Sequence, residues 1–310
     1  MKKIYDVIIA GCGPAGLSAG LRAKELNLNF LILERERVCN FISENYIQGK
    51  EVSCVPDNLE LKGNLWFKRC KVENLLEKWQ KTARMLNIHE NEEVLNVEKR
   101  ENFLVKTNKS NYYAKNVIVA IGKEAKPRKL NVKGENLKKV FYKLKNPNEF
   151  KGKKVLIVGG GDSAIEAALE LCKENKVSIS YRREKFFRLN EENSKKIDEA
   201  IKSKALEVIF SSNVKEIKER SITLEVFGKE KEIENDYIFI FAGSELPIEF
   251  FKRIENLKIE NDKVILDENF QTNIKGLFVI GDASGKPPFV IKNAINQGYD
   301  VVNFISKNMH

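Results

Sequence analysis

The stretch Tyr5-Asp6-Val7-Ile8-Ile9-Ala10-Gly11-Cys12-Gly13-Pro14-Ala15-Gly16 joins a β-branched run to three glycines in the pattern G-x-G-x-x-G. The run predicts a buried parallel strand, and leucines at helical spacing follow the last glycine. A second apolar run then ends at Glu34. Gly11 permits the tight turn after the strand, Gly13 leaves its backbone open to a pyrophosphate, and Gly16 lets the helix pack on the strand. The order therefore predicts a βαβ unit that binds a dinucleotide, with Glu34 placed to accept hydrogen bonds from a ribose.

The same order returns at Lys154-Val155-Leu156-Ile157-Val158-Gly159-Gly160-Gly161-Asp162-Ser163-Ala164, where Ala164 takes the place of the third glycine. The strand expected at residues 177–181 is followed by a cluster of arginines, and no acid closes it. Guanidinium groups suit the 2′-phosphate that distinguishes NADP from NAD. The second unit is therefore expected to prefer NADPH, with NADH the less favoured nucleotide. Its recognition cluster consists of Tyr181, Arg182, Arg183 and Arg188.

Further strands are expected to close each unit. The run at residues 116–122 follows an alternating segment that predicts a β-meander over residues 94–115. The run at residues 236–243 follows a matching meander over residues 208–235. One plan, consisting of a βαβ unit, a meander and a closing strand, is thus expected twice.

A last strand at residues 276–282 ends in Gly281-Asp282 and precedes an amphipathic helix. It has no unit of its own, so we expect it to rejoin the first one. The prediction is an α/β protein with two Rossmann-like, three-layer dinucleotide-binding domains, the second inserted into the first. The first domain spans residues 1–122 and 243–310, and the inserted domain spans residues 123–242.

Composition narrows the function further. The chain has 310 residues, of which 42% are hydrophobic and 32% charged, as in a globular protein. Two histidines are too few for a histidine metal site or a Ser-His-Asp triad, so no metal is expected. No apolar run reaches the roughly 18 to 20 residues of a membrane helix. The odd number of cysteines, five, and the absence of secretory features fit a reducing compartment, so we expect a cytoplasmic protein. The net charge of +10 favours an acidic partner, and neither nucleic acid nor a membrane is expected.

Together these residues resemble the two-dinucleotide-binding-domain flavoproteins, in particular the low-molecular-weight thioredoxin reductase family. The first glycine motif is similar to the family's FAD fingerprint, Gly281-Asp282 to its ribitol-binding turn, and the second glycine motif to its NADPH fingerprint. The resemblance implies a homodimer and cofactor contacts at further positions. For FAD it implies Gly11, Gly13, Pro14, Ala15, Gly16, Glu34, Arg35, Val94, Ala120, Gly122, Gly281, Asp282, Ile291 and Lys292. For NADPH it implies Gly159, Gly160, Gly161, Asp162, Ser163, Ala164, Tyr181, Arg182, Arg183, Arg188, Ala242 and Gly243.

The chain departs from that family in one decisive place. Thioredoxin reductases carry a C-x-x-C just before the second fingerprint, whereas residues 142–150 contain no cysteine, so thioredoxin reduction by that dithiol is excluded. The arginine cluster also has one more residue between Arg183 and Arg188 than the usual spacing. The closest likeness is to flavodoxin:quinone reductases, which lack the C-x-x-C, on the stretches at residues 61–67, 181–193 and 242–251. That likeness implies electron delivery from NADPH through flavin N5 to flavodoxin, ferredoxin or a quinone.

Two alternatives stay open at this point. A single-cysteine reductase of a low-molecular-weight disulfide would use Cys39 or Cys54, which both lie in the irregular region after Glu34. A non-catalytic protein would bind NADP(H) as a redox sensor. In the leading hypothesis no side chain acts as a catalyst, because the cofactors carry the chemistry and the protein orients them.

Overall fold

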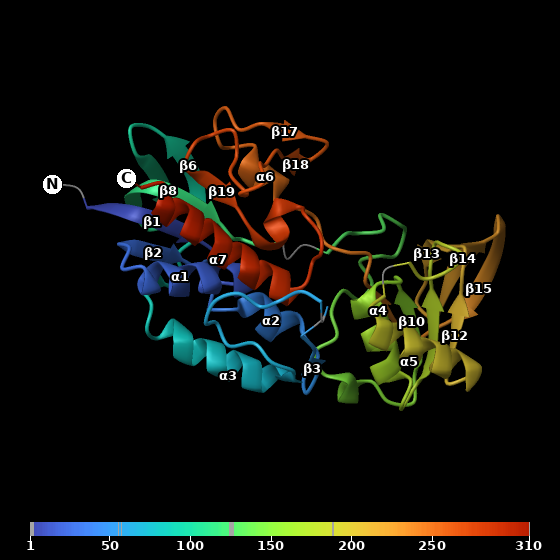
Figure 1. The fold of residues 1–310 in the computed structure, drawn as a ribbon. Coiled ribbons are helices and arrows are strands. Elements are labelled where there is room, and N and C mark those ends of the chain that lie inside the picture. Colours follow the sequence, from blue (N-terminus) through green and yellow to red (C-terminus); the bar gives the residue numbers. More distant parts are fainter. Residues whose placement is uncertain (1–2, 55, 57, 124–126, 188, 310) are drawn as a thin grey trace. The chain divides into compact units, whose positions relative to one another are not determined.

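The computed structural model divides the chain into two compact units (Figure 1). It describes residues 3–54, 56, 58–123, 127–187 and 189–309. The first unit comprises Met1–Glu44, Gly49–Ala125 and Glu245–His310. The second unit comprises Asn45–Gln48 and Lys126–Ser244. Within the described ranges, no helix combines the length and the hydropathy that crossing a membrane requires.

A mixed sheet forms the centre of the first unit (Figure 1). Its strands are β1 (Ile4–Ala10), β2 (Phe30–Leu33), β5 (Ile88–His89), β6 (Val94–Lys99), β7 (Phe103–Thr107), β8 (Asn111–Val119) and β19 (Leu277–Val279). They lie in the order β5-β2-β1-β8-β7-β6, and β19 also pairs with β8. β1 pairs in parallel with β2 and β8, and β19 in parallel with β8. The turn at Gly281-Asp282 therefore belongs to the first unit.

One continuous strand, β8, covers both the last strand of the expected first meander and the expected closing strand. The sequence predicted a meander up to residue 115 and a separate closing strand from residue 116, but β8 runs without a break through both. Its first half pairs antiparallel with β7, and it pairs in parallel with β1 along most of its length. The first meander is thus an extension of the main sheet and not a separate layer.

Helix α1 (Pro14–Glu25) packs on β1 and β2 of the first unit's sheet, and α3 (Val72–Ala83) and α7 (Ile291–Lys307) pack against α1 (Figure 1). Ser18 Oγ in α1 donates a hydrogen bond to the carbonyl oxygen of Ile295 in α7 at 2.8 Å. A Cβ added at Gly298 would lie 2.3 Å from the carbonyl oxygen of Ala15. Because a side chain there would separate the two helices, Gly298 is needed for their close approach.

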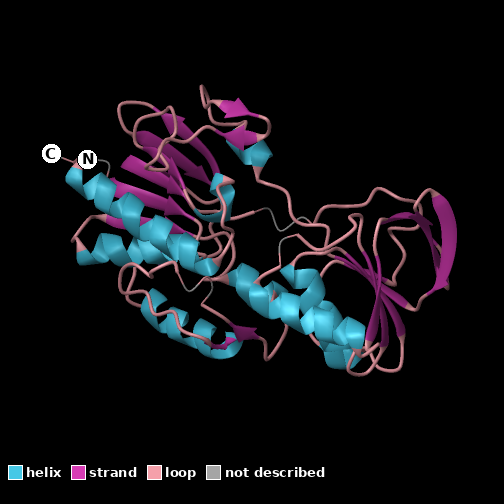
Figure 2. Cartoon of the chain, turned by 45° about the vertical axis from the view of Figure 1, so that its right-hand side comes forward, coloured by secondary structure: helices cyan, strands magenta, loops and turns pink. Residues whose placement is uncertain are grey.

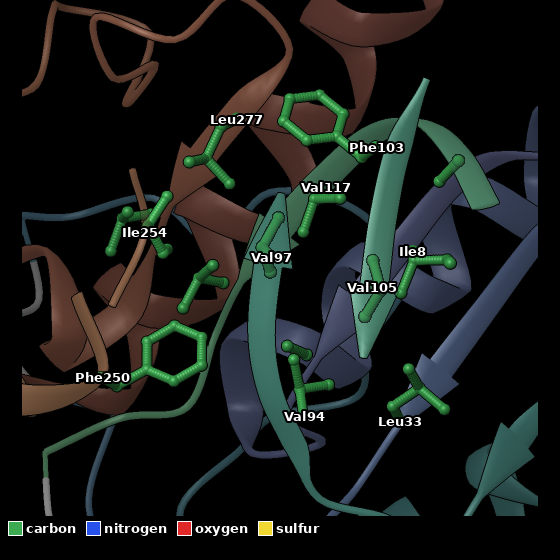
Figure 3. Packing of buried hydrophobic residues seen from close by; sticks show 14 of the residues in the cluster. Ile8, Leu33, Val94, Val97, Phe103, Val105, Val117, Phe250, Ile254 and Leu277 are labelled. Carbon is green, nitrogen blue, oxygen red and sulfur yellow. The ribbon is translucent and has the colours of Figure 1, made fainter. Parts of the chain in front are cut away.

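Buried hydrophobic side chains from the strands of the first unit meet α6 (Ile248–Phe251) and the residues after it (Figure 3). Val94, Phe103 and Val105 come from the meander, so the meander covers the core. Burying side chains of this size stabilises the fold by about 1.5 to 3 kcal/mol each. The labelled members of this cluster are Ile8, Leu33, Val94, Val97, Phe103, Val105, Val117, Phe250, Ile254 and Leu277.

The second unit is a three-layer structure (Figure 2). Its central sheet contains β9 (Val140–Phe141), β10 (Lys154–Val158), β11 (Lys176–Ser180), β12 (Leu206–Ile209) and β16 (Tyr237–Ile240). All are parallel, in the order β12-β11-β10-β16-β9. One face packs on α4 (Asp162–Leu171) and α5 (Glu191–Lys202). The other face packs on a separate antiparallel sheet of β13 (Ser212–Ile217), β14 (Ser221–Val226) and β15 (Lys229–Glu234).

The second meander thus forms its own sheet, whereas the first one merges with its main sheet. The expected order of βαβ unit, meander and closing strand is therefore present twice, and the two meanders differ in how they pair with the main sheet. The remaining elements are short. They are α2 (Asn40–Asn45), β3 (Glu51–Val52), β4 (Cys70–Lys71), η1 (Pro147–Glu149), β17 (Ile259–Glu260), β18 (Lys263–Val264) and the 3₁₀ turn η2 (Gly281–Ser284).

The second unit also contains residues 45–48, which come from the first half of the chain. Ile47 packs against the buried cluster of β10, β11, α4 and α5. The backbone N–H of Gln48 donates to the carbonyl oxygen of Lys145 at 3.0 Å. Nothing in the composition of this short segment indicates such a placement. The ends of the insert are held together by the backbone N–H of Arg128, which donates to the Gly243 carbonyl at 2.9 Å.

Candidate functional site

The first glycine motif forms an open cradle between β1 and α1. Gly11 has a φ of +98°, and a Cβ there would lie 2.5 Å from the Ala120 carbonyl oxygen. A Cβ on Gly16 would lie 2.0 Å from the Gly11 carbonyl oxygen. Around Gly13, by contrast, no described atom beyond Gly13 and its two chain neighbours lies within 4 Å of where a Cβ would be. Free space over the N-terminus of α1 is what a dinucleotide pyrophosphate requires.

Glu34 ties this cradle to the end of β2. The backbone N–H of Cys12 donates to Glu34 Oε2 at 2.6 Å, and the N–H of Glu36 donates to Oε1 at 2.9 Å. Burial raises the pKa of Glu34, although these two hydrogen bonds oppose the shift. Each carboxylate oxygen keeps a lone pair that can accept from a hydroxyl. The arrangement suits the ribose role predicted for Glu34.

Asp282 lies where β8 and β19 end, on the same edge of the sheet as the cradle. Gly281, at φ +66°, donates its N–H to Gln297 Oε1 at 2.7 Å and so fixes the turn. Burial raises the pKa of Asp282, and Lys123 opposes the shift with its Nζ 3.8 Å from Asp282 Oδ2. Lys123 was not among the residues predicted from the sequence, although its position directly after Gly122 could have indicated a role.

The start of α7 holds a loop of the first unit in place. Lys292 is 7% exposed, and its Nζ donates to the carbonyl oxygen of Pro56 at 2.7 Å. Asn296 Nδ2 donates to the Glu60 carbonyl at 2.7 Å, and Asn296 Oδ1 accepts from the Lys62 N–H at 2.8 Å. Lys292 was predicted as an FAD contact, and its ammonium group is engaged here by backbone. Asn296 was missed, because a polar residue inside an amphipathic pattern gives no signal of its own.

Two of the other residues expected at FAD lie away from the first glycine cradle. Most lie around the cradle, whereas Arg35 is exposed after β2, and Val94 begins β6 with its side chain in the core of Figure 3. Those around the cradle are Pro14 and Ala15 in the first turn of α1, Ala120 and Gly122 after β8, and Ile291 at the start of α7.

The second glycine motif repeats the open cradle between β10 and α4. Gly159 has a φ of +142°, and a Cβ there would lie 2.5 Å from the Phe241 carbonyl oxygen. In the described structure nothing lies within 4 Å of a Cβ on Gly161. Gly160 is different, because a Cβ there would lie 2.4 Å from the ring of Tyr181. Gly160 therefore makes room for Tyr181, a role that motif spacing does not reveal.

The expected recognition cluster follows β11. Tyr181 stacks on Phe186 with ring centres 5.3 Å apart. Arg182 and Arg183 are exposed, and the guanidinium carbon of Arg183 lies 5.0 Å from the centre of the Phe187 ring. Arg188 lies outside the described residues. Four other predicted positions frame this site, namely Ser163, exposed in α4, Ala164, buried beside Gly159, and Ala242 and Gly243 after β16.

Cys39 and Cys54 have different surroundings. Cys39 is 2% exposed, and its Sγ donates to the carbonyl oxygen of Cys12 at 3.5 Å. Burial raises the pKa of Cys39 and of Cys12, which disfavours the nucleophilic thiolate form. Cys54 is partly exposed. In the described part of the chain, no three His, Cys, Asp or Glu side chains gather as metal ligands would.

Known proteins match this chain along almost its whole length. The sequence profile of the pyridine nucleotide-disulphide oxidoreductases matches residues 8–281. The chain is 31% identical to a ferredoxin--NADP reductase of Malacoplasma penetrans, over 99% of this chain and 97% of that one. It is 32% identical to a thioredoxin reductase of Bacillus subtilis, over 96% and 92%.

A solved structure, the bacillithiol disulfide reductase Bdr (YpdA) of Staphylococcus aureus, superposes with a TM-score of 0.87 at 26% identity and 100% coverage of both chains. The fold, the two glycine cradles and the sequence matches all indicate the same family. The chain therefore belongs to the pyridine nucleotide-disulphide oxidoreductase family and is a thioredoxin-reductase-like flavoprotein that oxidises NAD(P)H.

Proposed function

We propose that the protein binds FAD in its first unit and NADPH in its second, and that it passes electrons to a small electron-carrier protein. The observation that carries this proposal is the pair of open cradles at Gly13 and Gly161, each at the N-terminus of the helix after a parallel strand. Two cradles in one chain fit two dinucleotides.

The purified protein should show an oxidised-flavin spectrum that bleaches on addition of NADPH. Protein that is colourless and takes up no added FAD would refute the proposal. The family assignment already leaves the non-catalytic alternative without support.

The residues of the first unit fit FAD by their chemistry. Glu34 offers carboxylate lone pairs to a ribose, and Asp282 offers a carboxylate to the ribitol chain, at the edge of the sheet where β1, β8 and β19 end. When bound, the flavin supplies the exchange between a two-electron donor and a one-electron acceptor. The chain itself needs only to bind the two cofactors, to orient them and to exclude water.

Ferredoxin is the acceptor that we favour. Relatives from Malacoplasma penetrans and Ignicoccus hospitalis are named ferredoxin--NADP reductases, at 31% and 29% identity. The missing C-x-x-C removes the dithiol route, and the charge of +10 suits an acidic partner. Flavodoxin fits the same charge, whereas a neutral quinone gains nothing from it.

We further propose a cytoplasmic homodimer, which analytical ultracentrifugation and cell fractionation would test.

The dependence of the reduction rate on salt concentration should distinguish a protein acceptor from a quinone. Raising ionic strength from about 0.05 to 0.5 M shortens the Debye length severalfold, so reduction of ferredoxin or flavodoxin should slow steeply while quinone reduction hardly changes. Stopped-flow rates at a series of NaCl concentrations measure this. Parallel salt curves for protein and quinone would show that the positive charge does not guide the acceptor.

A second candidate function rests on structural similarity to bacillithiol disulfide reductases of Staphylococcus aureus and Bacillus cereus, with TM-scores of 0.87 and 0.88. Such an enzyme would need a reactive thiol. Cys39 is a poor candidate because burial raises its pKa. Cys54 is the better one, because it is partly exposed.

We expect Cys39→Ser and Cys54→Ser proteins to keep most of their ferricyanide reduction, because the proposed route uses no thiol. Bacillithiol disulfide reduction is measured beside it. If the unaltered enzyme reduces that disulfide and Cys54→Ser abolishes the reaction while sparing ferricyanide reduction, the second candidate replaces the first.

A further inference from the structure

Asp162, which its place in the glycine motif puts among the residues expected at NADPH, has its carboxylate bonded to the start of α5. Its Oδ1 accepts hydrogen bonds from the backbone N–H of Asn190 at 3.1 Å and from Asn190 Nδ2 at 2.8 Å. The same oxygen accepts from Asn193 Nδ2 at 2.7 Å. Asn193 is 6% exposed, and Asn190 caps α5 by accepting from the Asn193 N–H at 2.9 Å. The carboxylate of Asp162 thus binds the start of α5 to the start of α4.

This contact fixes the C-terminal end, at Asn190, of the stretch that begins at Arg182, here called the arginine segment. The near end is held where the Ser211 N–H donates to the Arg183 carbonyl at 3.1 Å, and the middle where Phe186 stacks on Tyr181. Phe187, under the guanidinium of Arg183, lies between that stack and the Asp162 anchor. The described residues of this segment, 182–187 and 189–190, lie in no helix or strand. Because an irregular segment gains order from its ends, the position of Phe187 depends on the anchor.

We propose that Asp162 is a positioning residue for NADPH selection, which holds the arginine segment so that Arg183 stands ready for a 2′-phosphate. This proposal rests on the NADPH preference proposed above. A direct contact between Asp162 and the pyrophosphate is unfavourable, because both groups are negative. The hydrogen bonds to Asn190 and Asn193 give the carboxylate a function in the same place without that repulsion. Preorganisation of the arginine then lowers the ordering cost of binding.

The test compares two ligands that differ at the 2′ position, adenosine 2′,5′-bisphosphate and AMP. Calorimetry on the protein as purified gives both affinities. Asp162→Ala should weaken the bisphosphate by about fivefold or more and leave AMP within about twofold, since coupling energies between interacting groups are of this size. Asp162→Asn keeps Oδ1 as an acceptor and should lose less. Asp198→Ala removes an exposed carboxylate from α5 and is the matched control.

A double substitution tests whether Asp162 acts on bisphosphate affinity through Arg183. In an Arg183→Ala background, Asp162→Ala should cause no further loss of bisphosphate affinity, because the group that it positions is gone. Asn190→Ala provides a second route to the same loss if Asp162→Ala does not fold.

Equal losses for both ligands would show that Asp162 only stabilises the unit, and would overturn the proposal. Equal affinity of the unaltered protein for the two ligands would overturn the NADPH preference itself. The two failures are therefore distinguishable.

Discussion

Gly13→Val protein should fold and purify without flavin. No described atom lies within 4 Å of a Cβ at Gly13, and its φ of −76° suits any L residue, so the substitution should change the free energy of unfolding by less than about 1 kcal/mol. The added methyl groups fill the space that the pyrophosphate needs. Losing two charge-assisted hydrogen bonds, each contributing about 1.5 to 3 kcal/mol, weakens FAD binding by at least about 100-fold. Flavin absorbance per protein and the FAD dissociation constant measure the effect.

Gly161→Val is the matched partner of that variant. Its position is equally open, but it lies in the second unit. We expect it to keep the flavin spectrum and to lose bleaching by NADPH, while dithionite still bleaches it. If Gly13→Val retained its flavin, or if both variants lost it, the assignment of one cofactor to each cradle would be wrong.

The Arg182→Ala/Arg183→Ala protein should lose roughly 100-fold in kcat/KM for NADPH and less than about threefold for NADH. In the proposed NADPH complex each guanidinium group would make a charge-assisted contact to the 2′-phosphate, and solvent exposure places each such contact at the low end of about 1.5 to 3 kcal/mol. Steady-state rates with ferricyanide and either nucleotide give the two ratios.

Lys195→Ala/Lys202→Ala removes the same charge from exposed positions of α5 and controls for the overall field. Its NADPH and NADH efficiencies should change together and only slightly. Equal losses for both nucleotides in the double arginine variant would assign Arg182 and Arg183 to the fold and not to recognition.

Local signals predicted much of this protein. Both βαβ units follow the order of the sequence, because strand, glycine turn and helix are close neighbours along the chain. The second apolar run, which ends at Glu34, is the strand β2, Phe30–Leu33, as the βαβ prediction requires. The match to known proteins confirms the two-dinucleotide-binding-domain fold and the flavoprotein assignment. Gly11 and Gly159 could be assigned from spacing, since the positive φ of the turn after each strand is a local property. The backbone oxygens that a Cβ would meet there belong to Ala120 and Phe241, far along the chain, and spacing does not reveal them.

Features set by distant contacts could not be predicted in this way. α5 was not foreseen, because a helix that buries little more than Asn193, Ile197 and Ala200 shows only a narrow apolar stripe. The alternation of a meander does not say whether its strands join the main sheet, as β8 does, or pair among themselves, as β13 to β15 do. The orientation of Asp162 likewise depends on Asn190, which lies 28 residues further along the chain.

Residues 45–48 limit how this chain can be taken apart. A gene fragment for residues 126–244 would encode the whole central sheet of the second unit but not Ile47, which packs on its cluster, or Gln48, which bonds to Lys145. The excised fragment would expose an apolar patch and a backbone acceptor that the full chain covers. Any stand-alone nucleotide-binding module made from this protein must therefore carry residues 45–48 as a graft, and a chimaera that swaps the insert with a relative's must exchange that segment as well.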